Sequence, residues 1–255
     1  MSLSLLALQQ YCHQLLNVSA FKDYCPNGLQ IQSSDDDQLI KKLVTVVTAC
    51  EALIDQAIER NADAIMVHHG YFWKGELQAL TGMKGRRIRK LMQNNISLLA
   101  YHLPLDAHPQ LGNNMQLAQR LEIDITGGLD GGDFPIGNIG ELKKIQTLSQ
   151  FSEVIHTALN RAPLVIGDEQ RPLKRIAWCT GAAQSYLEKA ADQGVDCFIS
   201  GEISEPTVHI ARELDIAYIA AGHHATERYG VKALGEHLQQ QFTVDVEFVD
   251  IDNPV

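Results

Sequence analysis

The feature that most constrains the fold is an internal repeat of a strand, a helix and a second strand. Residues 43–70 read LVTVVTACEALIDQAIERNADAIMVHHG, and residues 175–202 read RIAWCTGAAQSYLEKAADQGVDCFISGE. In both copies an apolar run typical of a strand is followed by apolar residues at helical spacing and a second apolar run. The predicted strands and helices cover 43–48, 51–60 and 63–67, and then 175–179, 183–193 and 196–200. Asp63 thereby matches Asp196.

The repeat continues past the second strand. ISLLAYHLPLD (96–106) and IAYIAAGHHATE (216–227) are each an apolar strand followed by a histidine with a carboxylate four residues later. Alternating strands and helices build a mostly parallel sheet that helices cover. We therefore predict the α/β class, with mostly parallel sheets flanked by helices in two related lobes that arose by duplication.

We place the first lobe at residues 1–126 and the second at residues 127–255. The glycine-rich segment TGGLDGGDFPIGNIG (126–140) is the predicted boundary or connecting loop. The C-terminal segment is able to pack back on the first lobe.

Composition excludes several classes of protein. The 255 residues are 45% hydrophobic and contain no run of 18 apolar residues, as in a globular chain without a membrane span. The N-terminal MSLSLLALQQYCHQLL lacks the basic region of a signal peptide, so an amphipathic helix and a cytoplasmic location are predicted. Five scattered cysteines without a C-x-x-C pair argue against a disulfide framework. The net charge of -10 argues against nonspecific nucleic-acid binding.

Ligands bind outside the carboxyl ends of strands in parallel sheets, which directs attention to His68 and His69. They follow a predicted strand and match Gly201 and Glu202 of the second copy. In one interpretation, one histidine forms a hydrogen bond with the backbone at the strand end and the other faces solvent. Side chains of neighbouring strand residues point to opposite faces, so both serve one site only if the strand has ended, as Gly70 permits. A dinuclear metal site with a histidine for each ion fits that geometry.

HLPLDAH offers three further donors at another strand end, namely His102, Asp106 and His108. A cap is one interpretation of Asp106, but the next helix is predicted to begin near Asn113, too far downstream for the usual N-cap position. This distance from the helix favours a metal-binding role for Asp106 over a capping role.

GHHATERYG places His223 and Glu227 four residues apart, on one face of a helical turn. His224, three residues before Glu227, would also lie on the same face of the helical turn as this carboxylate. In the structural interpretation, Glu227 is a surface partner of Arg228 or Lys232.

Nitrogen and oxygen donors without thiolate suit Zn, Mn, Fe, Ni or Co, and carboxylates can bridge two ions. Ions ~3.5–4 Å apart would make hydroxide from bound water and clamp an attacked group. The basic run from Lys84 to Lys90 is either a solvated helix face or a phosphate-receiving patch. Glycine-rich phosphate loops and a G-x-S-x-G elbow are absent from the sequence.

These motifs resemble the NGG-interacting-factor-three-like family, also called GTP cyclohydrolase I type 2 homologues. The resemblance runs from YCPNGLQI (24–31) through ADAIMVHHGYFWKG, YHLPLDAHPQLGNN and DCFISGE to AGHHATERYG, which is nearly the whole chain. It is close to the short bacterial form, because no room remains for the extra domain of longer members.

The resemblance implies two divalent metal ions per subunit. The ligands that it implies are His68, His69, Asp106, His223 and Glu227. Asp106 and Glu227 would bridge the ions. The resemblance also implies a ring-shaped homohexamer whose sites face an internal cavity.

We expect two further residues to take part in catalysis. His102 would orient a ligand or move a proton, and Glu202 would be a carboxylate near the ions but outside their ligand sphere. Asn27 in PNGLQ lies near the site or is only a turn residue before Gly28.

The first functional hypothesis is a metal-dependent hydrolase of a nucleotide or related heterocycle, in which metal-bound hydroxide opens the imidazole ring of GTP. The second is a non-catalytic metal-binding scaffold or regulatory interaction protein. A redox enzyme that uses iron is a third. The expected partners are a small-molecule substrate and other copies of the chain, without a membrane.

Overall fold

The structure is a computed structural model that describes residues 3–33, 35 and 38–255. Strands and helices alternate as the repeat predicts, and the α/β class is confirmed. The chain forms two compact units, which we call the first unit (residues 1–105 and 230–252) and the second unit (residues 106–229 and 253–255). Within the described part of the chain, none of the helices combines the length and the apolar character needed to cross a bilayer.

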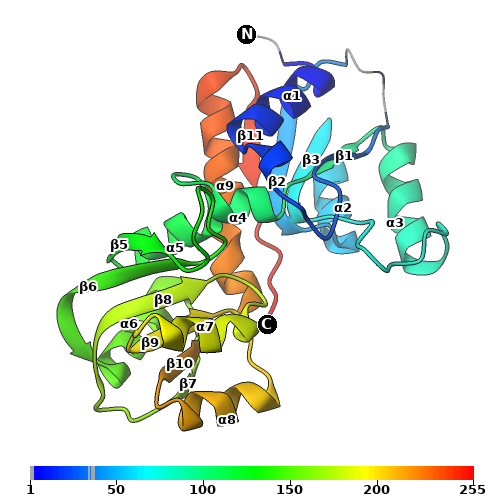
Figure 1. Ribbon diagram of the computed structural model, residues 1–255. Helices are drawn as coiled ribbons and strands as arrows, with labels where there is room; N and C mark the ends of the chain where they lie inside the picture. The colour runs from blue at the N-terminus through cyan, green and yellow to red at the C-terminus, as the bar shows by residue number, and fades with distance from the viewer. Residues whose placement is uncertain (1–2, 34, 36–37) are drawn as a thin grey trace. The chain divides into compact units, whose positions relative to one another are not determined.

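The first unit is a sheet with helices along its faces (Figure 1). Its elements are α1 (Leu5–Leu15), a 3-10 turn (Val18–Ala20), β1 (Gly28–Ile31), β2 (Lys42–Thr48), α2 (Glu51–Glu59), β3 (Ala64–His69), α3 (Gly82–Gln93), β4 (Ser97–Ala100) and β11 (Asp245–Phe248). The strand order is β1-β4-β3-β2-β11; β1 at the edge runs antiparallel to β4, and the pairs among β4, β3, β2 and β11 are parallel. The predicted N-terminal helix is α1, and Met1 and Ser2 lie outside the described residues.

Two helices connect the units along the chain. The short α4 (Leu103–Ala107) leaves the first unit, and the long α9 (His223–Gln241) starts in the second unit and ends in the first. β11 then pairs with β2, so the C-terminal segment does return to the first sheet.

The first sheet is buried on both faces. Neighbouring residues of a strand point to opposite faces of the sheet. On one face, Val44 belongs to the same buried apolar cluster as Leu53 of α2 and Ile88 of α3. The next residue, Thr45, points the other way toward α9, where a Cβ added at Gly235 would come 2.9 Å from the Thr45 Cγ2 atom. Burial on both faces explains why these strands are continuous apolar runs in the sequence.

The second unit is also a sheet between helices. Its elements are α5 (Asn113–Arg120), β5 (Ile123–Gly128), β6 (Asn138–Thr147), α6 (Leu148–Leu159), β7 (Leu164–Ile166), β8 (Pro172–Cys179), a 3-10 turn (Gln184–Tyr186), α7 (Leu187–Asp192), β9 (Cys197–Ser200), α8 (Glu205–Glu213) and β10 (Ala217–Ala220). The strand order is β5-β6-β8-β9-β10-β7. Strands β8, β9 and β10 are parallel, and β5, β6 and β7 add antiparallel pairs at the two edges.

The glycine-rich segment 126–140 lies within the second unit, where it connects β5 to β6. The predicted lobe boundary at residues 126 and 127 therefore falls inside β5. Because β5 pairs with β6 and β6 with β8, this part of the chain belongs to the second sheet. The division into lobes at residues 1–126 and 127–255 stays a prediction.

The repeat extends to individual hydrogen bonds. Asp63 accepts two consecutive backbone N–H groups of residues 41–42, at 2.8 and 2.9 Å from its Oδ2 atom. Asp196 accepts those of residues 174–175, both at 2.8 Å. Each carboxylate thus ties the start of its strand to the start of the strand before it, which explains the match between the two aspartates.

The register of the third strand in each copy corrects the alignment by one residue. The backbone N–H of Tyr101 bonds to a carbonyl of β3, and that of Ala221 bonds to the corresponding carbonyl of β9. His102 therefore corresponds to Gly222, and His223 lies one residue further along. The two histidines occupy neighbouring rather than equivalent positions of the repeat.

Candidate metal centre

His68 and His69 lie at the carboxyl end of β3, which runs through His69, so the expectation that the strand ends before them is wrong. His69 is the last residue of the strand and pairs in register with Thr48 of β2. The two ring centroids are 4.6 Å apart nonetheless. His68 is fully buried and His69 is half-buried. Together with His102 they form what we call the first-unit edge.

Both imidazoles are hydrogen-bonded through Nδ1. The Nδ1 atom of His68 lies 3.0 Å from the carbonyl oxygen of Tyr101, and that of His69 lies 3.2 Å from the Thr48 hydroxyl. A carbonyl can only accept, so Nδ1 of His68 carries the proton. Nε2 is then the nitrogen that can coordinate a metal, an arrangement typical of metal-binding histidines.

His102 follows β4 and contacts two residues that precede β1. Its Nδ1 atom lies 2.7 Å from Asp23 Oδ1, and its backbone N–H donates to Asn27 Oδ1 at 2.8 Å. Burial raises the pKa of Asp23, but hydrogen bonds from His102 and Asn27 and the charge of His102 outweigh burial and lower it. Asn27 is thus near the candidate site, as one of its two sequence interpretations holds.

The ligand atoms of His68, His69 and His102 all lie within 4.8 Å of one another. Cys25 groups with Asp23 and His102 in the same way. Burial and the charge of Asp23 raise the pKa of Cys25 to about 12, so this residue stays a thiol at neutral pH.

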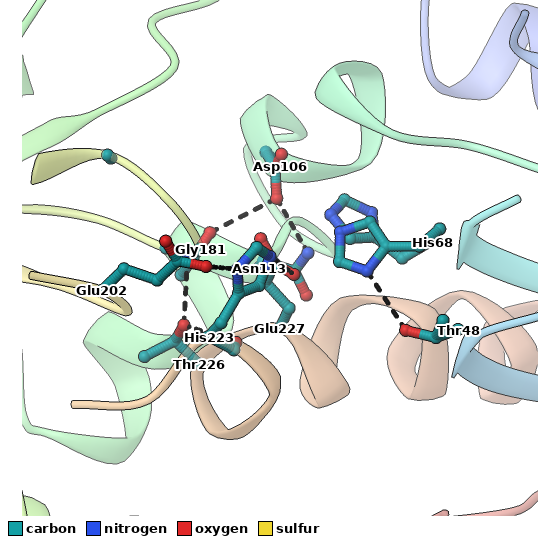
Figure 2. A network of polar contacts seen from close by, with 12 residues as sticks. Thr48, His68, Asp106, Asn113, Gly181, Glu202, His223, Thr226 and Glu227 are labelled. Carbon is teal, nitrogen blue, oxygen red and sulfur yellow. Dashed lines mark hydrogen bonds and ion pairs between the residues drawn. The ribbon is translucent and has the colours of Figure 1, made fainter. Parts of the chain in front are cut away.

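In the second unit, the first turn of α9 and the strand ends form what we call the second-unit edge: Asp106, Glu202, His223 and Glu227. His223 lies between two carboxylates, with Nε2 3.0 Å from Glu227 Oε2 and Nδ1 2.7 Å from Glu202 Oε1 (Figure 2). The spacing of His223 and Glu227 on one helix face is confirmed.

The charges at this edge favour a protonated imidazole in the metal-free protein. Burial lowers the pKa of His223, but the hydrogen bonds and charges of Glu227 and Glu202 outweigh burial and raise it to about 9. Glu227 is only 3% exposed, so its interpretation as a surface ion-pair partner is wrong. Two carboxylates around one imidazole make a cation-binding environment.

Asp106 is buried within α4 and is oriented by two donors. Its Oδ1 atom accepts from the Asn113 amide at 2.8 Å (Figure 2) and from the Thr180 hydroxyl at 3.3 Å. Since Asp106 sits inside α4, it does not cap α5. Both donors fix one carboxylate oxygen, which orients the other for binding.

Gly181 is a residue of this edge that the sequence patterns missed. It has a φ of +67°, and a Cβ added there would lie 2.0 Å from Glu227 Oε1. Its signal is the T-G pair at the end of β8, the strand that matches β2. Thr180, beside it, and Asp23 in the first unit carried no periodic or spacing signal.

Two other candidates have structural roles. In the basic run, Lys84 pairs with Glu76 at 3.3 Å and Lys90 pairs with Asp55, so part of its charge is neutralised locally. His108 accepts backbone N–H groups through Nδ1 and shapes the turn before α5.

The donors at both edges fit divalent metal ions. Imidazole nitrogens are held by hydrogen bonds to their Nδ1 atoms, and the carboxylates are ordered by neighbouring donors. Nitrogen and carboxylate oxygen are the ligands expected of Zn, Mn, Fe, Ni or Co sites. The candidate metal-binding character predicted from the sequence is thus supported in each unit.

Comparison with known proteins identifies close relatives of the whole chain. The chain is 53% identical over 252 residues to a GTP cyclohydrolase 1 type 2 homolog of Vibrio cholerae, covering 98% of this chain and 99% of the relative. It is 54% identical over 250 residues to the protein of that name from Pasteurella multocida, covering 98% of each.

Solved structures share the fold. One is protein ybgI, described as of unknown function, with a TM-score of 0.93, 46% identity and coverage of 99% of this chain and 100% of that one. Another is TTHA1606 from Thermus thermophilus, with a TM-score of 0.86, 31% identity and coverage of 97% and 98%. The model of the Duf34/NIF3 (NGG1p interacting factor 3) family matches residues 4–254, and the chain therefore belongs to this family.

Proposed function

We propose that the protein binds two divalent metal ions per chain and uses them to hydrolyse a nucleotide or a related heterocycle. The proposed ligands are those expected from the sequence, namely His68, His69, Asp106, His223 and Glu227. The observation that carries the proposal is the orientation of the imidazoles: His68, His69 and His223 are each hydrogen-bonded through Nδ1, which leaves Nε2 as the coordinating atom.

The choice of reaction is supported by the relatives and by the kind of donors. Curated relatives are named GTP cyclohydrolase 1 type 2 homologs, a name that refers to them and not to a measured activity of this chain. When bound, paired divalent ions polarise an attacked group and activate water. Hydrolysis of a heterocycle needs both effects, whereas a purely structural metal needs neither.

The residues of the chain would have distinct roles in such a reaction. Asp106, held by Asn113 and Thr180, and Glu227, beside Gly181, would bind the metal ions through their carboxylates. Glu202 would accept a hydrogen bond from the Nδ1–H group of His223 and hold that ring in place. His102, fixed by Asp23, would orient a ligand or move a proton at Nε2.

The test begins with full-length protein that is stripped of metal, reloaded separately with Mn, Zn, Fe, Ni or Co, and analysed for ions per chain. We expect two ions per chain, and turnover in a panel of nucleotides that includes GTP. Glu227→Ala should lose both. Glu236→Ala is the matched control, because Glu236 is exposed on the same helix α9 and should change neither.

Two results would contradict different parts of the proposal. A protein with two ions per chain that is inert across the panel would not be a nucleotide hydrolase, and the metal-binding scaffold would then be the better description. A protein that binds no divalent ion would contradict both descriptions.

A further inference from the structure

Asp23 has an unusually complete set of hydrogen bonds for a carboxylate outside the proposed ligand set. Its Oδ1 atom accepts from the backbone N–H of Tyr24 at 2.6 Å and lies 2.7 Å from His102 Nδ1. Its Oδ2 atom accepts from the Asn27 amide at 2.8 Å and from the backbone N–H of Leu103 at 2.9 Å. The side chain is only 4% exposed. Its backbone and amide partners are donors, as an ionised carboxylate requires.

This network fixes the tautomer of His102. A carboxylate that already receives three N–H groups can only accept from the fourth partner, so Nδ1 of His102 carries the proton. In the neutral imidazole the lone pair is then on Nε2. Asn27 supports the same geometry, because its amide donates to Asp23 while its carbonyl accepts the backbone N–H of His102.

The oriented ring belongs to the cluster of histidines in the first unit. Its centroid lies 5.0 Å from that of His68 and 5.8 Å from that of His69, and Trp73 packs edge-on against it at 5.0 Å. The ligand atoms of the three histidines lie within 4.8 Å of one another. Three imidazoles with an oriented Nε2 form a donor set of the kind that catalytic zinc sites use.

We propose that His102 is a further metal ligand, in place of the proton-transfer role considered above, and that Asp23 is the positioning residue that makes it one. The proposal rests on the proposed function in that it assigns a third imidazole to an ion bound at the first-unit edge. Glu202 and His223 repeat the arrangement in the second unit, with the same 2.7 Å between the carboxylate and Nδ1. A carboxylate that accepts a hydrogen bond from Nδ1–H raises the basicity of the coordinating nitrogen.

The test uses full-length protein loaded with Co²⁺, whose visible absorption reports the number and type of its ligands. Competition with a chromophoric chelator gives the affinity for each ion. His102→Ala should lower the affinity for one Co²⁺ ion at least tenfold and change the absorption spectrum. Added imidazole should restore the spectrum, because it can occupy the vacated position. A residue that only supports the backbone would not be rescued in this way.

Asp23→Asn tests the positioning role. The amide keeps the volume, but its NH₂ group replaces one oxygen and must face the two donors that this oxygen accepts from, so the network that orients His102 is weakened. We expect Co²⁺ affinity to fall by ~10–100-fold, the usual effect of removing such a partner. His209→Ala is the matched control, since His209 pairs with Glu205 at 2.9 Å on the surface and should leave affinity and spectrum unchanged.

Folding is checked by circular dichroism and by thermal unfolding of the metal-free variants. His102→Gln, which keeps a polar group of similar length, serves if His102→Ala is unfolded. The proposal is overturned if a folded His102 variant binds Co²⁺ with the affinity and spectrum of the wild type. That outcome leaves the two-ion function standing if the wild type binds two ions. The wild type could instead bind a single ion, with an affinity that His102→Ala lowers and a spectrum that added imidazole restores. That outcome would support the His102 proposal and contradict the two-ion function.

Discussion

Four imidazoles at the strand ends share one feature at the residue scale, which is a hydrogen bond to Nδ1. The partner differs each time: a backbone carbonyl for His68, a hydroxyl for His69, and a carboxylate for His102 and His223. Two of these partners, Asp23 and Glu202, are charged, and a charged acceptor makes Nε2 a stronger ligand than a neutral one does. The chemistry of the edges is therefore set as much by the residues behind the histidines as by the histidines themselves.

The raised pKa of His223 predicts how the metal-free protein responds to pH. Because the folded-state value of about 9 lies above the ordinary value of 6.5, protonated His223 stabilises the fold below pH 6.5, and this contribution is lost as pH rises through 9. The loss is at most ~1.4 kcal/mol per pH unit. Urea unfolding with a chelator present, at pH 6, 7.5 and 9, should show this loss of stability. A His223→Gln variant should lose less stability over this range, and equal losses would contradict the prediction.

Gly181 supports a second prediction at this scale. An alanine there would place its Cβ 2.0 Å from Glu227 Oε1, so the carboxylate must move and metal affinity should fall at least tenfold. Gly194→Ala is the control, because Gly194 has nearly the same φ of +65° but no atom within 4 Å of an added Cβ. Both variants share the cost of a positive φ, ~1 kcal/mol or more, so only the difference in affinity reports the displaced carboxylate. Equal metal affinities in the two variants would contradict this prediction for Gly181.

At the element scale, the repeat made most of the architecture predictable. Apolar runs buried on both faces and helices between them are strong local signals, so β2, α2 and β9 lie close to their predicted bounds. The antiparallel strand β6, which spans Asn138–Thr147, carried no such signal, because its burial does not alternate regularly. The end of β3 was misplaced because histidine has no strong preference that marks a strand boundary.

The candidate site was predictable only in part for a related reason. His68, His223 and Glu227 have neighbours in sequence at spacings that indicate metal binding. Asp23 is 79 residues away from His102, and such a contact exists only once the sheet has brought β1 beside β4. Contacts of this kind depend on tertiary structure and leave no local pattern.

The matched aspartates Asp63 and Asp196 give a prediction for the two copies of the repeat. Each accepts two backbone N–H groups, so replacement by alanine leaves both donors without that acceptor. We expect each variant to lower the free energy of unfolding by ~1–3 kcal/mol, and the two losses to be similar. Denaturant titration measures both. Asp133→Ala, in an exposed loop, should stay within ~0.5 kcal/mol of the wild type, and a loss as small for either matched aspartate would contradict the shared role.

At the scale of the whole molecule, the family resemblance leads us to expect a homohexamer. Light scattering after size-exclusion chromatography should then give about six times the 28.2 kDa chain mass. Large apolar side chains that are exposed in the single chain, such as Leu77 at 81% and Met83 at 55%, are the kind of surface that such an assembly covers. A mass of one chain, with metal and without it, would contradict the expectation.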